Sequence, residues 1–259
     1  MHQMSPRFFV DPGQIAGELI SIVGEELVHL ERVLRLQAGA AIIVCDGSGR
    51  EYQAVLREVG RELAVAQITA ICQSTTEPRL RITLVQGLPK ADKMDFIIQK
   101  GTELGIHEFL PVMTERTVVR LEGSKAQRRM ERWQRIAQEA AKQSRRAVIP
   151  RVNGPITWQA CLAKYREMPV GALGLFPWES ATGKLLRDVL PNTWESNDSH
   201  HPLEVWICIG PEGGWSPEEA EAAGLANLIP LSLGSRILRT ETAGMVVAAL
   251  VLYASGDLG

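Results

Sequence analysis

The first seventy residues contain short runs of β-branched and apolar residues separated by turn signals. Residues 42–45 and 52–56 are two such runs, and the Asp46–Gly47 pair between them is typical of a β-hairpin. A third run covers 63–68, and residues 27–34 have the spacing of a short helix. The pattern predicts a small β-barrel or β-sandwich at the start of the chain.

The spacing of apolar residues changes after residues 73–78. This polar segment ends in proline and is the best linker candidate in the chain. Beyond it, strand-like runs alternate with helical periodicity, which predicts an α/β domain with a largely parallel sheet. Strands are expected at 80–86, 109–112, 170–176 and 203–209, and helices at 91–104, 125–144, 184–190, 217–223 and 242–254.

Composition narrows the class of protein without deciding it. The chain has 259 residues, enough for two domains, and its 45% hydrophobic and 22% charged residues are typical of a folded globular protein. Its net charge of −2 means that nucleic-acid binding would need cations clustered on one face. Four scattered cysteines without a C-x-x-C pair argue against a metal site. Without a signal-peptide pattern or a membrane-length apolar run, we expect a cytoplasmic protein with no membrane partner.

A glycine-rich turn follows the strand expected at 203–209. Its sequence, Gly-Pro-Glu-Gly-Gly at 210–214, leads into a helix start where Ser216, Pro217 and Glu219 match a capping box. Ligands of open α/β sheets bind at the carboxyl ends of strands, where glycines let the backbone approach them closely. A purely structural tight turn fits equally well. The patterns of a P-loop and of a dinucleotide-binding turn are absent, which argues against ATP and NAD.

A charged loop precedes the most apolar helix of the chain. Arg236, Arg239 and Glu241 lie just before residues 242–254, which are hydrophobic almost all round and predict a buried helix or a subunit interface. Charges at such a place must be paired or must face a ligand. For the loop taken alone, an arginine–glutamate pair that closes the end of the sheet is the simpler interpretation.

Basic residues cluster on the helix expected at 125–144 and just after it. A charge run usually marks a solvated helix face, but the C-terminal half of this one is nearly all positive, which favours phosphate binding. The cluster consists of Arg128, Arg129, Arg132, Arg135, Lys142, Arg145, Arg146 and Arg151.

Ten short segments occur in the order found in one known family. They cover residues 6–10, 29 with 33–35, 90–94, 102–105, 114–116, 132–133, 139–140, 143–146, 210–214 and 236–243. On these segments the chain resembles the RsmE family of 16S ribosomal RNA uridine-N3 methyltransferases, members of the SPOUT superfamily. The resemblance covers nearly the whole chain. Two positions depart from the family pattern, Ser235 where proline is usual and Gly101 where alanine is usual.

The resemblance implies a fold and a set of partners. It implies a PUA-like β-barrel RNA-binding domain over residues 1–73 and an α/β SPOUT methyltransferase domain over 79–259, in which the chain forms a trefoil knot. General topology rules argue against knots, so this expectation rests on the resemblance alone. It also implies S-adenosyl-L-methionine as cofactor, 16S rRNA of the small ribosomal subunit as partner, no metal, and a homodimer with the last helix in its interface.

The resemblance further implies that three loops at strand ends build the cofactor pocket. The adenosyl group would lie against backbone and small apolar residues rather than in a charged cradle. The residues expected to bind it are Leu175, Phe176, Ile209, Gly210, Pro211, Glu212, Gly213, Gly214, Leu231, Leu233, Gly234, Arg236, Ile237, Leu238, Thr242 and Ala243.

The expected reaction is attack of uracil N3 on the sulfonium methyl, to which the protein contributes positioning and charge stabilisation. We expect Arg236 and Arg239, and then Arg116, to stabilise negative charge on the flanking carbonyl oxygens. Glu241 is expected to orient an arginine or to accept the proton. The residues expected to bind RNA phosphates are Arg7, Arg35, Arg132, Arg145 and Arg146.

Three alternatives belong to other classes of function. An inactive RNA-binding module would keep the basic surface without a cofactor pocket. A related SPOUT enzyme would methylate a ribose or a tRNA guanine, and only family analogy argues against it. A nucleotide hydrolase is disfavoured because the sequence has neither a P-loop nor a metal-ligand pattern.

Overall fold

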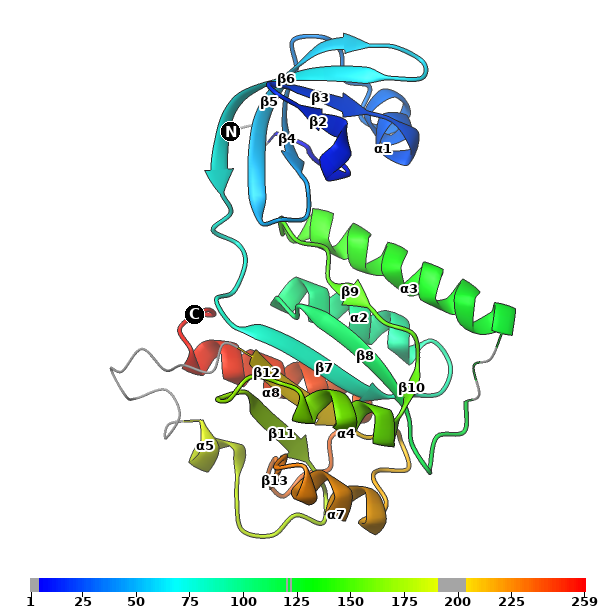
Figure 1. The fold of residues 1–259 in the computed structure, drawn as a ribbon, viewed down its shortest axis with the longest axis vertical. Coiled ribbons are helices and arrows are strands. Elements are labelled where there is room, and N and C mark those ends of the chain that lie inside the picture. The colour runs from blue at the N-terminus through cyan, green and yellow to red at the C-terminus, as the bar shows by residue number, and fades with distance from the viewer. Residues whose placement is uncertain (1–4, 120, 122, 191–203) are drawn as a thin grey trace. The chain divides into compact units, whose positions relative to one another are not determined.

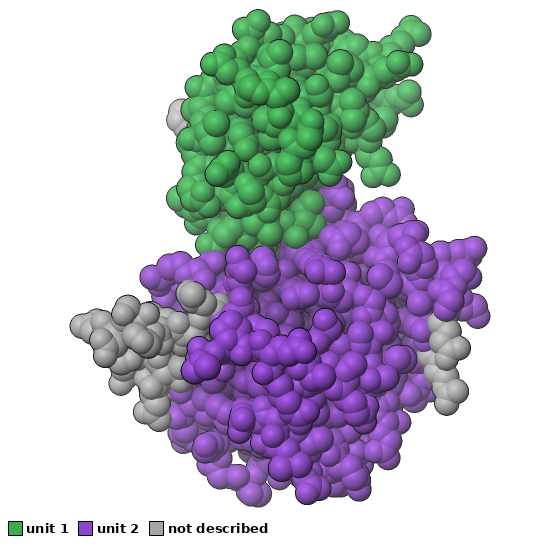
Figure 2. Space-filling model, in the orientation of Figure 1, with its two compact units in different colours: residues 1–77, 141–149 green, residues 78–140, 150–259 purple. Residues whose placement is uncertain are grey.

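The computed structural model describes residues 5–119, 121, 123–190 and 204–259 (Figure 1). The chain forms two compact units, coloured separately in Figure 2. Unit 1 contains Met1–Glu77 and Ala141–Ile149, and unit 2 contains Pro78–Ala140 and Pro150–Gly259. The segment at 141–149, which the sequence places in the second domain, therefore belongs to unit 1.

Unit 1 is built on a six-stranded sheet in the order β1-β4-β5-β6-β3-β2. The predicted hairpin is confirmed, because β4 and β5 pair antiparallel from Ala41 opposite Val55 to Cys45 opposite Glu51. β1 pairs parallel with β4, and the remaining pairs are antiparallel. The strands are β1 (Arg7–Phe9), β2 (Ile15–Ala16), β3 (Leu19–Ile22), β4 (Ala41–Cys45), β5 (Arg50–Val59) and β6 (Ala64–Gln73).

The short helix expected at 27–34 forms as two pieces. It is an α-helix, α1 (Gly24–Val28), followed by a π-helical turn, η2 (His29–Val33), which closes with a 3.0 Å bond from the Leu34 N–H to the His29 carbonyl. Arg35 then adopts a positive φ of 51° and ends the helical path. Both pieces contribute apolar side chains to a core under the sheet, which includes Phe8, Ile20, Ile22, Leu27 and Leu30.

The polar segment expected as a linker is anchored within unit 1. Glu77 accepts hydrogen bonds from Nη2 of Arg146 at 2.8 Å and from the backbone N–H groups of Ala147 and Val148 at 2.8 and 3.1 Å. Arg146 is only 3% exposed. The prediction that Arg146 binds RNA phosphates is therefore wrong, because its guanidinium is buried against a carboxylate.

Unit 2 contains a seven-stranded sheet whose strand pairs are all parallel. This confirms the expected α/β architecture. The order is β10-β8-β7-β12-β11-β13, with β9 also paired to β8. The strands β9, β10 and β13 have only two or three residues each, so the spacing of apolar residues could not predict them. The strands are β7 (Arg81–Gly87), β8 (Glu108–Met113), β9 (Arg151–Val152), β10 (Ile156–Thr157), β11 (Leu173–Pro177), β12 (Glu204–Ile209) and β13 (Ile229–Leu231).

Helices pack on both faces of this sheet, as expected for parallel strands. α2 and α8 pack together, with α8 against β7 and β12, whereas α4 and α7 pack on the opposite face. Among the described residues, no helix is long and apolar enough to cross a membrane. The helices are α2 (Lys93–Leu104), α3 (Gly123–Gln143), α4 (Trp158–Arg166), α5 (Leu186–Val189), α7 (Pro217–Leu225) and α8 (Thr240–Ala254).

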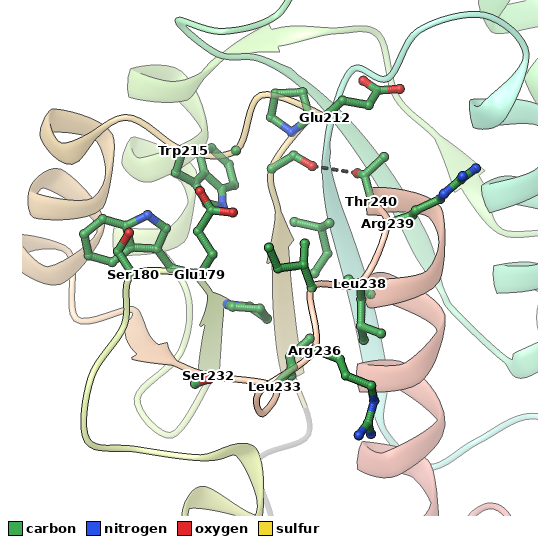
Figure 3. A pocket seen from close by; sticks show the side chains of 18 of the residues that line it. Glu179, Ser180, Glu212, Trp215, Ser232, Leu233, Arg236, Leu238, Arg239 and Thr240 are labelled. Carbon is green, nitrogen blue, oxygen red and sulfur yellow. Dashed lines mark hydrogen bonds between the residues drawn. The ribbon is translucent and has the colours of Figure 1, made fainter.

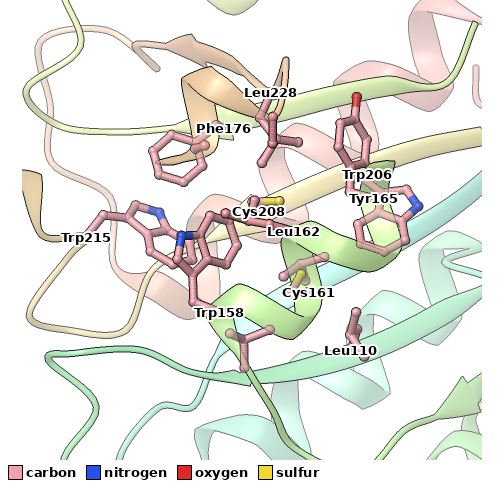
Figure 4. Close-up of a cluster of buried hydrophobic side chains, with 14 of the residues drawn as sticks. Leu110, Trp158, Cys161, Leu162, Tyr165, Phe176, Trp206, Cys208, Trp215 and Leu228 are labelled. Atoms are coloured by element: carbon pink, nitrogen blue, oxygen red, sulfur yellow. The ribbon is translucent and has the colours of Figure 1, made fainter. Parts of the chain in front are cut away.

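An aromatic cluster fills the space between the sheet and α4 (Figure 4). The ring of Trp215 lies 4.6 Å from that of Trp158 and 4.9 Å from that of Phe176, measured between centroids. All three side chains are nearly inaccessible to solvent. Since Trp215 follows the glycine-rich turn directly, this packing fixes the end of the turn to the core.

Gly101 has a packing reason in this chain. A Cβ at that position would lie 2.7 Å from Phe109 and 2.8 Å from Ile106, closer than side-chain atoms normally approach. The ring of Phe109 therefore occupies the space that an alanine methyl would need, and the departure from the family pattern is compensated within the core of unit 2.

Candidate active site

A pocket of about 810 Å³ lies at the carboxyl ends of β11, β12 and β13 (Figure 3). Loops at 177–180, 209–215 and 232–239 line it, together with Lys93 of α2 and the start of α8. Its volume is that of a site for a small molecule or cofactor. Its position is the usual one for ligands of open parallel sheets, because the loops that follow the strands converge there.

Most of the residues expected to bind the cofactor line this pocket. Leu175, Phe176 and Leu231 do not, because they are buried inside strands and the pocket begins one or two residues further on. Gly213 and Thr242 also lie outside the lining. The residues that line it as expected are Ile209, Gly210, Pro211, Glu212, Gly214, Leu233, Gly234, Arg236, Ile237, Leu238 and Ala243.

Several lining residues were not expected from the sequence. Residues 178–180 follow β11 directly, so the strand-end rule applied to the other loops would have found them. Lys93 places a cation in the first turn of a helix, where the helix dipole disfavours it, and this is a signal for a tertiary partner. The residues added by the structure are Lys93, Trp178, Glu179, Ser180 and Trp215, whereas Pro177, Ser232, Ser235 and Thr240 lie in the three loops expected to build the pocket.

The glycines of the turn at 210–214 allow close backbone approaches. A Cβ on Gly210 would lie 3.2 Å from the backbone of Gly214, and one on Gly87 would lie 2.6 Å from the backbone nitrogen of Pro211. Gly214 also has a positive φ of 69°. The turn thus has a structural need for glycine and lines the pocket as well, so the two interpretations of its sequence are compatible.

The helix after this turn begins with the predicted capping box. The Glu219 N–H donates to Oγ of Ser216 at 3.3 Å, and the Ser216 N–H donates to Oε2 of Glu219 at 3.0 Å. The other carboxylate oxygen of Glu219 accepts the Glu115 N–H at 2.8 Å. One buried carboxylate therefore fixes the start of α7 and the loop after β8.

Three charged side chains meet at the rim of the pocket. Nζ of Lys93 lies 3.0 Å from Oε1 of Glu212 and 3.1 Å from Oε2 of Glu241. Partial burial raises the pKa of Glu212, but hydrogen bonds from Lys93 and the backbone outweigh it and place this pKa below its ordinary value. Contacts with Glu212 and then Glu241 raise the pKa of Lys93. The interpretation of this loop as an arginine–glutamate pair is therefore wrong, because the ion-pair partner of Glu241 is Lys93.

The two arginines of the charged loop are free to meet a ligand. Arg236 and Arg239 line the pocket, are exposed and form no ion pair within the described part of the chain. Figure 3 shows their side chains diverging, so the structure does not bring the two guanidinium groups together. Arg116 lies outside the lining, where its Nη1 donates to the Gly213 carbonyl at 2.9 Å and supports the turn from behind.

The remaining arginines expected to bind RNA differ in availability. Arg7 is 10% exposed and its Nη1 lies 3.0 Å from Oε1 of Glu51, so the prediction that it binds phosphates is wrong. Arg35 and Arg145 are exposed in unit 1. Arg132 is exposed on α3 in unit 2 and pairs with Asp95.

Comparison with known proteins places this pocket in a family context. Residues 76–252 match the family model described as an RNA methyltransferase domain, and residues 23–69 match an RNA methyltransferase PUA domain. The ribosomal RNA small subunit methyltransferase E of Bacillus subtilis is 34% identical over 90% of this chain and 89% of its own length. The Synechocystis protein of the same name is 35% identical over 96% of this chain and 77% of its own length.

A solved structure extends the comparison to the fold. The crystal structure of ribosomal RNA small subunit methyltransferase E from Neisseria gonorrhoeae, bound to S-adenosyl methionine, is 31% identical in sequence. It matches with a TM-score of 0.81 over 96% of this chain and 98% of that chain. On its sequence and its fold, the chain belongs to the ribosomal RNA small subunit methyltransferase E family.

Proposed function

We propose that the protein transfers the methyl group of S-adenosyl-L-methionine to N3 of a uridine in the 16S rRNA of the small ribosomal subunit. The observation that carries this proposal is the pocket at the ends of β11, β12 and β13. It lies within the region that matches the RNA methyltransferase domain, in a fold shared with a relative that binds S-adenosyl methionine.

The lining of the pocket fits an adenosyl amino acid. Ile209, Leu238 and Ala243 provide apolar side chains, and the glycine-rich turn adds backbone that is not covered by side chains. The Nε1–H of Trp215 is a buried donor on the lining without a hydrogen-bond partner in the described chain. The carboxylate of Glu179 adds an acceptor for hydroxyl or ammonium groups.

The chain contributes position and charge to the reaction. When bound, S-adenosyl-L-methionine supplies a sulfonium methyl that is already activated for attack by a nitrogen lone pair. Arg239 and Arg236 are the pocket cations that form no ion pair with the described residues, and we assign them to the negative charge that develops on the uracil carbonyl oxygens. Glu241 holds Lys93 together with Glu212, so we assign it to the rim rather than to orienting an arginine.

A basic stripe on α3 is the proposed contact with RNA phosphates in unit 2. Lys125, Arg128, Arg132 and Arg135 follow each other at intervals of three or four residues, so they share one helix face, and all four are exposed. We propose that Arg35 and Arg145 bind phosphates from unit 1. Replacing Arg128 and Arg135 by glutamine should lower the slope of log affinity against log salt by about 2, since each phosphate contact contributes about 0.9.

The exposed side of α8 supports the proposed homodimer. α8 is largely apolar, and two of its large apolar side chains are exposed: Leu250 by 45% and Tyr253 by 69%. Neighbouring turns add Met245, Val246 and Ala249 to the same side, all partly exposed. We expect light scattering to give twice the chain mass, and Leu250→Glu to give the single chain mass.

The proposed fold is more specific than the two sheets described above. We infer that the sheet of unit 1 closes as a PUA-like barrel and that unit 2 contains the trefoil knot. In support of the knot, the loop at 232–239 leads from the edge strand β13 back to α8 on the central strands. If the chain is pulled from both ends after unfolding, a knot should leave a contour shorter than that of 259 free residues.

The function is tested by supplying labelled cofactor to the substrate. Purified protein is incubated with methyl-labelled S-adenosyl-L-methionine and small ribosomal subunits that lack the modification, and the RNA is digested to nucleosides. We expect label in N3-methyluridine and in no other nucleoside. Label on a ribose or a guanine would indicate another enzyme specificity, and absence of cofactor binding would support an inactive RNA-binding module.

A further inference from the structure

The first turn of α8 contains the acidic residue Glu241 but lacks the side-chain cap that helix starts usually have. Its N-cap residue is Arg239, which makes no side-chain capping bond. Ser, Thr, Asp and Asn are strongly preferred at this place, and a cation there is opposed by the helix dipole. The position of this turn is therefore expected to depend on contacts from elsewhere in the chain.

A buried chain of hydrogen bonds holds this turn from two distant strands. Oγ1 of Thr240, the first residue of α8, donates to the carbonyl of Gly210 at 2.6 Å, drawn as a dashed line in Figure 3. Because the hydroxyl has one proton, its oxygen must accept the second bond, which comes from Nε2 of Gln86 at 2.8 Å. Nε2 also donates to the Gly87 carbonyl at 3.0 Å, so both amide protons are used. The chain joins β7, β12 and α8.

Gln86 is an unfavourable residue for stability alone. It is fully buried, and its Oε1 has no hydrogen-bond partner among the described residues. A buried acceptor without a donor is costly, whereas an apolar side chain of the same size would avoid that cost. A polar residue that is retained under such conditions next to a pocket suggests a functional reason.

We propose that Gln86 is a positioning residue for methyl transfer, acting through Thr240. The Gln86–Thr240–Gly210 chain fixes the floor of the pocket at Gly210 relative to Arg239, which immediately precedes Thr240. Gln86 itself lies outside the pocket lining, so its effect must pass through Thr240. This inference rests on the proposed function, and in particular on the assignment of Arg239 to the reacting uracil.

The main test replaces Gln86 by methionine, which has similar volume and adapts to its surroundings. The change removes the unsatisfied oxygen together with the two bonds that Nε2 donates, so the free energy of unfolding is measured in parallel and every rate is referred to folded protein. The single-turnover rate at saturating S-adenosyl-L-methionine should fall about tenfold to a hundredfold, because a small displacement of a positioned group has such an effect. Thr240→Val should lower the rate similarly, and Thr240→Ser should restore it.

Thr102 provides a matched control. It is a fully buried threonine on α2 whose Oγ1 donates to the Ile98 carbonyl at 2.7 Å, away from the pocket. Thr102→Val should destabilise the fold without changing the single-turnover rate. The inference is overturned if the wild type methylates RNA and Gln86→Met does so at the same rate, or if its rate falls only in proportion to a loss of folded protein.

The two proposals fail in different ways. If the wild type transfers no methyl group, the proposed function is wrong, and the positioning role is judged from cofactor affinity measured by calorimetry. An unchanged dissociation constant for S-adenosyl-L-methionine in Gln86→Met and Thr240→Val would then overturn it.

Discussion

The starts of α7 and α8 border the same pocket but are built in opposite ways. α7 begins with Ser216, Pro217 and Glu219, a capping box made from neighbours in the sequence. α8 begins with an uncapped arginine, and its first turn is held by Gln86, which is 154 residues away from Thr240 in the chain. Local sequence suffices where only a stable turn is needed. Distant contacts are used where a cation must be held at the pocket.

The largest expected effect comes from giving α8 an ordinary start. Arg239→Ser supplies a preferred N-cap residue, so the free energy of unfolding should rise by about 1 kcal/mol. The rate of methyl transfer should fall on the order of 10²- to 10³-fold, the usual effect of removing one group that stabilises transition-state charge. Urea unfolding and single-turnover kinetics measure the two quantities.

An arginine outside the pocket controls for charge. Arg187 is 80% exposed on α5, so Arg187→Ser removes the same charge and should leave the rate unchanged. A wild-type rate in Arg239→Ser would contradict the role assigned to Arg239.

The next largest effect is expected at Glu219, whose carboxylate caps the start of α7. Glu219→Ala removes the acceptor for the N–H groups of Ser216 and Glu115 in a buried place. Each orphaned donor is costly, so the free energy of unfolding should fall by about 2–4 kcal/mol. Transfer by the remaining folded protein should be near the wild-type rate. A large loss of rate in fully folded protein would mean that α7 also positions reacting groups.

A smaller effect is expected at the cap itself. Ser216→Ala should lower the free energy of unfolding by about 1 kcal/mol, because the Glu219 N–H loses its side-chain acceptor. Cofactor affinity and transfer rate should not change, in contrast to Thr240→Val at the start of α8. Equal losses of rate in the two variants would remove the distinction between the two helix starts.

The smallest effect depends on pH and concerns the ion pairs at the start of α8. The pKa of Glu212 is lowered in the folded protein, so its contribution to stability is present above the ordinary value of 4.5 and is lost as pH falls through the folded pKa. The stability difference between wild type and Glu212→Gln should be constant from neutral pH to about pH 4.5 and shrink below it. A difference that grows on acidification would contradict this sign.

The sequence predicts those parts of the molecule that local patterns encode. The β4–β5 hairpin and the α7 capping box carry their signals in consecutive residues, and most lining residues could be found from the loops that follow strands. The partner of Glu241 could not be found in this way, because Lys93 lies far away in the sequence and an arginine stands two residues from the glutamate. Arg146 likewise has the pattern of a solvated cation, yet the fold buries it against Glu77.

Amide hydrogen exchange at equivalent positions of the two helices tests the difference most directly. The Ala243 N–H donates to the Arg239 carbonyl at 2.9 Å, and the Ala220 N–H donates to the Ser216 carbonyl at 3.0 Å, so each reports the first turn of its helix. In Gln86→Met, exchange at Ala243 should accelerate while exchange at Ala220 stays at its wild-type rate. Unchanged exchange at Ala243, or equal acceleration at both positions, would contradict a start of α8 that is held from a distance.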